Sequence, residues 1–220
     1  MAADTTGNVW VVDYGDARMT LLSSSGSAVS SSTGWGAGEL DLPVAVAVDA
    51  SHNAWVANQS DYTIARISAD GSSATQITCC NGASGLAVDQ AGNVWVANYF
   101  GNSISEVSSA GSVLLDGVTG GGVHTPTVVA IDGAGRVWVG NYERASLSEF
   151  AGYNSATPAA PLSPSAGLGT DAQLGSPFAV AIDASGNLWV SNSNGANTVT
   201  TFVGLATPVK TPLLGPAQLP

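Results

Sequence analysis

Charged residues are scarce in this 220-residue chain, at 10% of the total, and basic residues are the scarcest of them. Five Lys and Arg residues stand against 16 Asp and Glu residues, which gives a formal net charge of −11. A chain of this charge repels polyanions, and it has no basic cluster to neutralise phosphates. We therefore expect neither nucleic acid nor an anionic membrane surface as a partner.

Long apolar runs are absent as well. No stretch approaches the roughly 20 apolar residues that a membrane-spanning helix needs, so we expect no membrane insertion. No segment combines the charged start and apolar centre of a secretory signal peptide. We nevertheless expect an exported bacterial protein, extracellular or periplasmic, whose leader is not part of this sequence.

Cysteine is limited to the adjacent pair Cys79 and Cys80. Neighbouring cysteines cannot close a long loop, so two interpretations stay open: an eight-membered disulfide ring, or two small residues in a turn. No further soft ligands lie near the pair, so it does not predict a metal site. We expect no metal and no cofactor.

What the chain does contain is an internal repeat, in which an Asp precedes a Trp by six residues through a turn of the form Asp-x-x-Gly-Asn. The Asp positions 4, 49, 89, 132 and 183 are separated by 45, 40, 43 and 51 residues. These spacings are typical of propeller repeats. Each Trp lies in an apolar segment that ends in Asn or, in the first copy, Asp.

Each repeat predicts four short strands. An apolar run such as 44–48 is followed by the Asp turn, the Trp strand, an alternating strand such as 103–108, and a weaker fourth strand such as 74–78. One such sheet cannot cover its own faces, so neighbouring sheets must stack. The sequence therefore predicts an all-β fold, a β-propeller of about five four-stranded blades.

The predicted domain is single and spans residues 1–220, with repeats at about 1–41, 42–83, 84–125, 126–176 and 177–220. Residues 1–4 hold only the end of a first strand, and the Pro-rich segment 206–214 can supply at most an irregular edge strand. The first and last blades are thus candidates for incomplete blades. We favour a compact five-bladed ring; the alternative is part of a larger propeller whose open edges pair with another copy.

An insertion at 152–176 contains Pro158, Pro161 and Pro164 among small residues. It predicts a long surface loop without regular structure.

This pattern resembles the NHL-repeat family of β-propellers over nearly the whole chain. The resemblance lies in the apolar strand, the Asp and Gly-Asn turn, the apolar-Trp-Val-x-Asn segment and the later Ile-x-x-Ile-Ser strand. The chain is also distantly similar to the propellers that include virginiamycin B lyase. In that family a second-strand Glu supports a metal and loop histidines abstract a proton. The matching strand positions here are Asp13, Asn58, Asn98, Asn141 and Asn192.

The two ends of a propeller differ, and we call one end the loop face. It is formed by the loops between second and third strands and by the links between blades. Loops on a rigid scaffold usually carry binding, so we place the ligand site there. The candidate ligand-binding residues are Tyr14, Tyr62, Tyr99, Phe100, His124, Tyr142 and Arg144.

Tyr14, Tyr99, Phe100 and Tyr142 fall at equivalent or adjacent loop positions, as a stacking platform for a sugar or peptide would require. Packing between neighbouring blades is the alternative explanation of these aromatic side chains. The repeated Asp and Asn are interpreted as closing turns and loops. We assign no catalytic residue and no metal ligand.

Three hypotheses follow. The first is a non-enzymatic binding or interaction module whose partner is a protein, a peptide or a glycan. The second is a lyase or hydrolase of the virginiamycin B lyase-like type, with His124 acting beside a loop carboxylate, for which Asp16, Asp61 and Glu143 are equal candidates, with or without a divalent cation. The third is a propeller fragment that forms a homo-oligomer through its blade edges.

Overall fold

The computed structural model describes residues 1–170, 174–193 and 198–209, and these fold into 17 strands in five antiparallel sheets. No helix occurs in these ranges, and so none that could span a membrane. The described part of the chain is all-β, as predicted.

The sheets follow one another in sequence. The first contains β1 (Ala2–Ala3), β2 (Val9–Asp13) and β3 (Arg18–Leu22). The second contains β4 (Pro43–Val48), β5 (Ala54–Asn58), β6 (Thr63–Ile67) and β7 (Ala74–Thr78). The third contains β8 (Ala83–Val88), β9 (Val94–Asn98), β10 (Ser103–Val107) and β11 (Val113–Val118). The fourth contains β12 (Pro126–Ile131), β13 (Val137–Asn141) and β14 (Ser146–Phe150), and the fifth β15 (Pro177–Ile182), β16 (Leu188–Asn192) and β17 (Val199–Phe202).

The repeated Trp holds each sheet against the next one. Trp55 of the second sheet, for example, packs with Ala83, Leu86 and Val94 of the third. Trp10, Trp95 and Trp138 make the corresponding contacts from their own sheets. We call the face that carries the Trp the forward face of a sheet, and the opposite one its back face. The core therefore consists of four successive layers, each between a forward face and the next back face.

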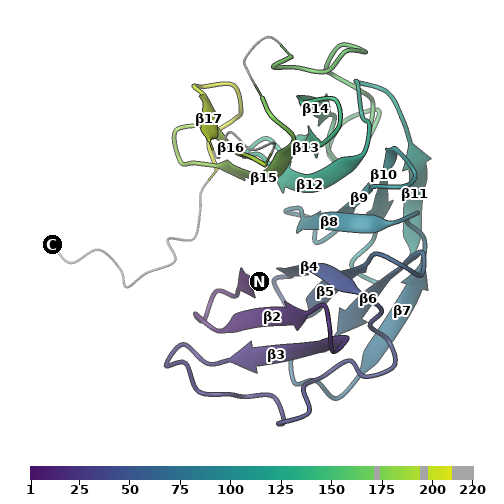
Figure 1. Ribbon diagram of the computed structural model, residues 1–220, viewed down its shortest axis with the longest axis vertical. Helices are drawn as coiled ribbons and strands as arrows, with labels where there is room; N and C mark the ends of the chain where they lie inside the picture. The colour runs from purple at the N-terminus through teal and green to yellow at the C-terminus, as the bar shows by residue number, and fades with distance from the viewer. Residues whose placement is uncertain (171–173, 194–197, 210–220) are drawn as a thin grey trace, which may run out of the picture.

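The five sheets form an arc in which β7 and β11 lie on the outer side and β4, β8 and β12 lie nearer the centre (Figure 1). Every closely packed pair of described strands belongs to one sheet or to two successive sheets. The first and fifth sheets lie at opposite ends of the arc (Figure 1). The described residues therefore do not form the closed five-bladed ring favoured from the sequence, because the first and fifth sheets do not pack on each other.

The outer strands are less regular than predicted. Only the second and third sheets have a fourth strand among the described residues. In the first sheet, isolated bridges pair Met19 with Trp35 and Leu22 with Ala28 along the outer edge of β3. The incomplete first and last blades agree with the sequence, whereas the three-stranded fourth sheet was not anticipated.

The insertion at 152–176 covers the edge of the fourth sheet. Bridges join Leu147 to Leu168 and Phe150 to Pro161 along β14. Ala159 is buried in the core, and the backbone N–H of Leu162 donates to the carbonyl of Glu149 at 2.8 Å. The described part of the insertion lacks regular strands, as predicted, but it is not a free surface loop.

Candidate ligand-binding site

In the second to fifth sheets, the residue after the Trp strand is held by a backbone hydrogen bond to the link between blades. The N–H of Tyr99 donates to the carbonyl of Gly82 at 2.8 Å, and that of Tyr142 donates to Thr125 at 3.0 Å. Gly82 and Thr125 have φ values of 73° and 43°, in the left-handed region. This conformation turns the chain into the first strand of the blade. Both Tyr side chains thus start from the same backbone framework.

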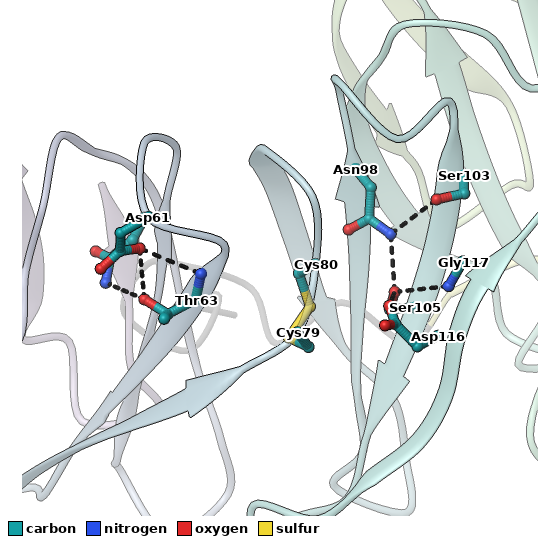
Figure 2. Close-up of a disulfide and its surroundings, with 10 residues drawn as sticks. Asp61, Thr63, Cys79, Cys80, Asn98, Ser103, Ser105, Asp116 and Gly117 are labelled. Carbon is teal, nitrogen blue, oxygen red and sulfur yellow. Dashed lines mark hydrogen bonds between the residues drawn. A yellow bond between two sulfur atoms is a disulfide. The ribbon is translucent and has the colours of Figure 1, made fainter.

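A buried Asn at the end of each inner Trp strand closes the following loop. The Nδ2 of Asn98 donates to the hydroxyls of Ser103 and Ser105 at 3.0 and 2.8 Å, as Figure 2 shows. Asn141 makes the same pair of bonds to Ser146 and Ser148. The loop-closing interpretation of these Asn residues is confirmed, with side-chain hydroxyls as the partners, and their amide NH₂ groups are committed to the scaffold.

A cavity of about 540 Å³ lies where the loops of the second, third and fourth sheets meet β4, β8, β12 and β15. We call it the axial cavity. Three aromatic residues line it, Tyr99, Tyr142 and Phe178. Its wall includes Gln59 and aliphatic residues, and none of its lining residues is charged.

Two hydroxyl residues of the cavity wall tie adjoining sheets together. The Oγ of Ser84 donates to the carbonyl of Pro126 at 2.7 Å, and the Oγ1 of Thr127 donates to that of Pro177 at 2.7 Å. These bonds join β8 to β12 and β12 to β15. They fix the spacing of the inner strands, so the cavity is a preformed feature of the fold.

The structure brings together only part of the predicted site. Of the seven candidates, Tyr99 and Tyr142 line the axial cavity. The other five are absent from its lining: Tyr14, Tyr62, Phe100, His124 and Arg144. Phe100 packs edge-on against Tyr99, with ring centroids 5.3 Å apart, and supports that ring. Whether any of the seven binds a ligand stays a prediction.

Sequence reasoning missed Gln59 and Phe178. Gln59 occupies the repeat position of Tyr99 and Tyr142, so equivalence of position was a usable signal. Phe178 lies in a first strand, so reasoning from loop positions does not reach it. Its repeat equivalents in the third and fourth sheets are Ser84 and Thr127, so an aromatic residue in place of a hydroxyl residue was visible in the sequence.

His124 and Glu143 form a second, smaller cluster on the loop face. The Nδ1 of His124 lies 3.6 Å from a carboxylate oxygen of Glu143, and both side chains are partly exposed. The Oγ1 of Thr125 accepts the backbone N–H of Glu143 at 3.0 Å and lies 3.5 Å from the same imidazole nitrogen. Across the described ranges, no group of three or more His, Cys, Asp or Glu is placed to hold a metal ion.

Cys79 and Cys80 are joined by a disulfide in the link between the second and third sheets (Figure 2). Both residues are buried, and Cys80 has a φ of 67°. The link continues into Asn81, whose carbonyl accepts the N–H of Gly101 at 3.0 Å, and then into Gly82, which holds Tyr99. The disulfide ring therefore lies in the same link as Gly82, the residue whose carbonyl holds Tyr99 at the cavity wall.

Solved structures with the same arrangement of sheets are propellers. The chain superposes on a streptogramin B lyase with a TM-score of 0.67 and 13% identity, over 95% of this chain and 68% of that one. For virginiamycin B lyase from Staphylococcus aureus the TM-score is 0.68 and the identity 12%, over 91% and 68% of the two chains. A protein of unknown function from Bacteroides caccae gives 0.63 and 16%, over 94% and 78%.

The chain is a β-propeller. At these identities the likeness shows the fold alone. No protein-family model and no curated protein sequence matches the chain, so membership of the NHL-repeat family stays a prediction. The likeness to propellers of the virginiamycin B lyase type is supported at the level of structure.

Proposed function

We propose that this propeller is a non-enzymatic binding module that holds an uncharged, ring-bearing group in its axial cavity. The observation that carries the proposal is the convergence of Tyr99, Tyr142 and Phe178 on one preformed cavity of about 540 Å³. Small-molecule sites commonly occupy roughly 300–1,000 Å³ and are lined mainly by apolar and aromatic side chains with a few polar groups.

The chemistry of the wall selects against a charged ligand. An ion in this cavity would lose its hydration without meeting an opposite charge, because no lining residue is charged. The net charge of −11 adds a long-range repulsion against anions. Aromatic rings and sugar faces instead stack on Tyr and Phe, while the Gln59 amide and the Tyr hydroxyls can satisfy hydroxyl or amide groups.

The test is binding to arrays of neutral glycans and uncharged peptides, repeated with three variants. Tyr142→Ala and Phe178→Ala should weaken binding of any hit about tenfold or more, since each removes an aromatic wall. Tyr14→Ala is the matched control, because Tyr14 has the same repeat position but lies outside the cavity. Equal signals from all three variants, or hits restricted to charged ligands, contradict the proposal.

A second candidate, a lyase or hydrolase, is favoured by the contact between His124 and Glu143. A carboxylate that orients an imidazole is a common arrangement for a general base. Two of the solved neighbours are lyases by name. The test is turnover of a panel of lactones and esters. A rate that falls in both His124→Ala and Glu143→Gln supports this candidate. Turnover that is absent, or unchanged by both substitutions, removes it.

A further inference from the structure

The buried amide oxygen of Asn98 lacks a donor that its equivalents have. In the second, fourth and fifth sheets, the Asn that ends the Trp strand accepts a backbone N–H from the link before its own sheet. The pairs are Asp41 N–H to Asn58 Oδ1 at 3.2 Å, His124 N–H to Asn141 Oδ1 at 3.1 Å and Gly175 N–H to Asn192 Oδ1 at 3.0 Å. In Figure 2 the Nδ2 of Asn98 makes two hydrogen bonds, but its Oδ1 has no partner among the described residues. A buried polar atom without a partner is rare and needs an explanation.

The equivalent donor in the third sheet is the N–H of Asn81. Asn81 stands directly before Gly82, the left-handed residue of its link, just as each of the three donors stands before a left-handed residue. Residue type does not explain the missing bond, since every non-proline residue carries this N–H. The difference lies one residue earlier, where Cys80 has a φ of 67°. None of its equivalents has a positive φ; these are Leu40, Val123 and Leu174.

The disulfide explains this backbone conformation. Cys79 and Cys80 are adjacent, so the bond between their sulfur atoms closes a small ring that contains the peptide bond between them. The φ rotation of Cys80 takes place about a bond of this ring, so the ring restricts it. The same rotation sets where the next peptide group points, and that group carries the Asn81 N–H. While the ring is closed, this N–H does not reach the Asn98 oxygen.

A disulfide between neighbours acts on the local backbone more than on the whole chain. A disulfide restrains the unfolded chain more when it closes a longer loop, and adjacent cysteines close the shortest one possible. Both cysteines lie in the apolar layer between the second and third sheets, beside Trp55. Two free thiols also suit this layer, because a buried Cys behaves as a small hydrophobic residue. The layer therefore accepts both redox states.

We propose that the Cys79–Cys80 disulfide is a redox switch that changes the conformation of its link and moves Tyr99 with it. In the oxidised state the link has the conformation described above. In the reduced state the ring is open, Cys80 takes a negative φ like its equivalents, and the N–H of Asn81 donates to Oδ1 of Asn98. Reduction thus replaces a covalent bond by a hydrogen bond that three other sheets already have.

The link holds the loop after the Trp strand through two consecutive carbonyls. The carbonyl of Asn81 accepts the N–H of Gly101 at 3.0 Å, and that of Gly82 accepts the N–H of Tyr99 at 2.8 Å. The Phe100 ring lies so close to Gly82 that a side chain there would collide with it. A rotation at Asn81 therefore moves Tyr99, which lines the axial cavity. The effect on ligand binding rests on the proposed function, whereas the switch itself does not.

Reduction requires a dithiol as the electron donor. A thiolate of the dithiol attacks Sγ of Cys79, the less buried of the two residues, and forms a mixed disulfide, while Cys80 leaves as a thiolate and takes up a proton. The second thiol of the donor then displaces Cys79, which is protonated in turn. Two electrons and two protons pass to the protein, and the donor becomes a cyclic disulfide. Because both cysteines are buried, the attack takes place when the link opens locally.

NMR spectroscopy and amide hydrogen exchange in dithiothreitol test the switch without any ligand. We expect reduction to slow exchange of the Asn81 N–H about tenfold or more, because this group gains an acceptor. The ring signals of Tyr99 should shift as well. The His124 N–H and the Tyr142 ring are internal controls that should not change, since they hold the equivalent places in the fourth sheet, which has no cysteine.

A variant that cannot form the disulfide checks the same point without reductant. Cys79→Ala combined with Cys80→Val places at position 80 the residue type that the fourth sheet has at Val123. We expect slow Asn81 exchange in this variant both with and without dithiothreitol. Fast exchange in the variant would contradict the proposal, because the open link would then fail to bring Asn81 to Asn98.

Three results in the wild type overturn the proposal. The first is a disulfide that stays intact in the folded protein in excess dithiothreitol, as measured by alkylation of free thiols. The second is complete reduction with unchanged exchange of the Asn81 N–H. The third is a change of equal size at His124, which would show general loosening instead of a switch. Arrays without a ligand would contradict only the proposed function, because none of these readouts uses a ligand.

Discussion

The indole Nε1 of Trp95 donates a 3.0 Å hydrogen bond to Oδ2 of Asp89, six residues earlier in the chain. The other carboxylate oxygen accepts the backbone N–H groups of Ala91 and Asn93, both at 2.9 Å. One carboxylate therefore closes the turn and orients the side chain that packs on the next sheet. Four of the five repeats make this indole bond, which explains the constant Asp-to-Trp spacing. In the first repeat the spacing is kept, but Trp10 Nε1 is buried without a hydrogen-bond partner among the described residues.

Asp89→Ala should lower the free energy of unfolding by about 3 kcal/mol, because it leaves three donors without their acceptor. Asp70→Ala is the control, since Asp70 closes an exposed turn through Ser68 and Ser72 and carries no Trp. It should change the free energy of unfolding far less than Asp89→Ala does. Urea unfolding of both variants measures the difference, and equal losses would contradict the double role.

Acid should destabilise the fold through the same turns. Burial of Asp4 opposes its ionisation, but hydrogen bonds from Thr6 and Asn8 outweigh burial and lower its pKa from 3.8 to about 2. Burial also opposes the ionisation of Asp49, but hydrogen bonds from Asn53 and Trp55 outweigh burial and lower the pKa of this carboxyl. A carboxyl with a depressed folded pKa stabilises the protein above its unfolded pKa, and that contribution is lost as pH falls through the folded value.

We therefore expect the melting temperature to drop between about pH 4 and about pH 2, since this window separates the unfolded and folded pKa values of Asp4. Asp4→Asn should reduce the slope of melting temperature against pH in this window. A slope identical to that of the wild type would count against these carboxylates.

Glu106 should show the opposite pH dependence. Its burial, and then the negative charge of Asp89, raise the pKa of this carboxyl, although Asn93 donates to it at 2.9 Å. A raised folded pKa means that ionisation costs stability as pH rises above the unfolded value. Glu106→Gln keeps an acceptor for Asn93, so it should raise the melting temperature at pH 7 and lose this advantage below about pH 4. A lower melting temperature at pH 7 would contradict the prediction.

The disulfide between Cys79 and Cys80 should stabilise the wall of the axial cavity. Removing it loosens the link that holds Tyr99. The double substitution Cys79→Ala and Cys80→Ala also truncates two buried side chains, so it should lower the free energy of unfolding by about 0.5–3 kcal/mol. A thiol reductant should lower the melting temperature of the wild type but not that of the double variant. If the reductant lowers the melting temperature of both proteins equally, the effect does not come from the disulfide and the prediction is wrong.

The insertion should contribute to stability through Ser163. Its Oγ donates to the carbonyl of Gly121 at 2.8 Å and accepts the N–H of Glu149 at 2.9 Å. Ser163→Ala should cost about 1–3 kcal/mol, because both partners are left unsatisfied near the core. Ser155→Ala, in the exposed part of the insertion, is the control and should change little. Equal free energies of unfolding for the two variants, measured in urea, would contradict the prediction and indicate that the insertion does not stabilise the fold.

The sequence by itself determined the repeated parts of this protein. The Asp turns, the Trp strands and the loop-closing Asn residues depend on contacts within about ten residues, so their spacing in the chain is enough to predict them. The stacking of sheets also followed, because a small sheet with two apolar faces has no other way to bury them.

Tertiary structure decided what happens at equivalent positions that have different neighbours. Tyr14 and Tyr142 share one place in the repeat, but only Tyr142 has sheets on both sides to build a cavity around it. Trp138 and Trp189 also share one place, yet among the described residues only Trp138 is covered by a following sheet. The arc that the described sheets form arises from the summed packing of whole interfaces (Figure 1). No single repeat encodes it.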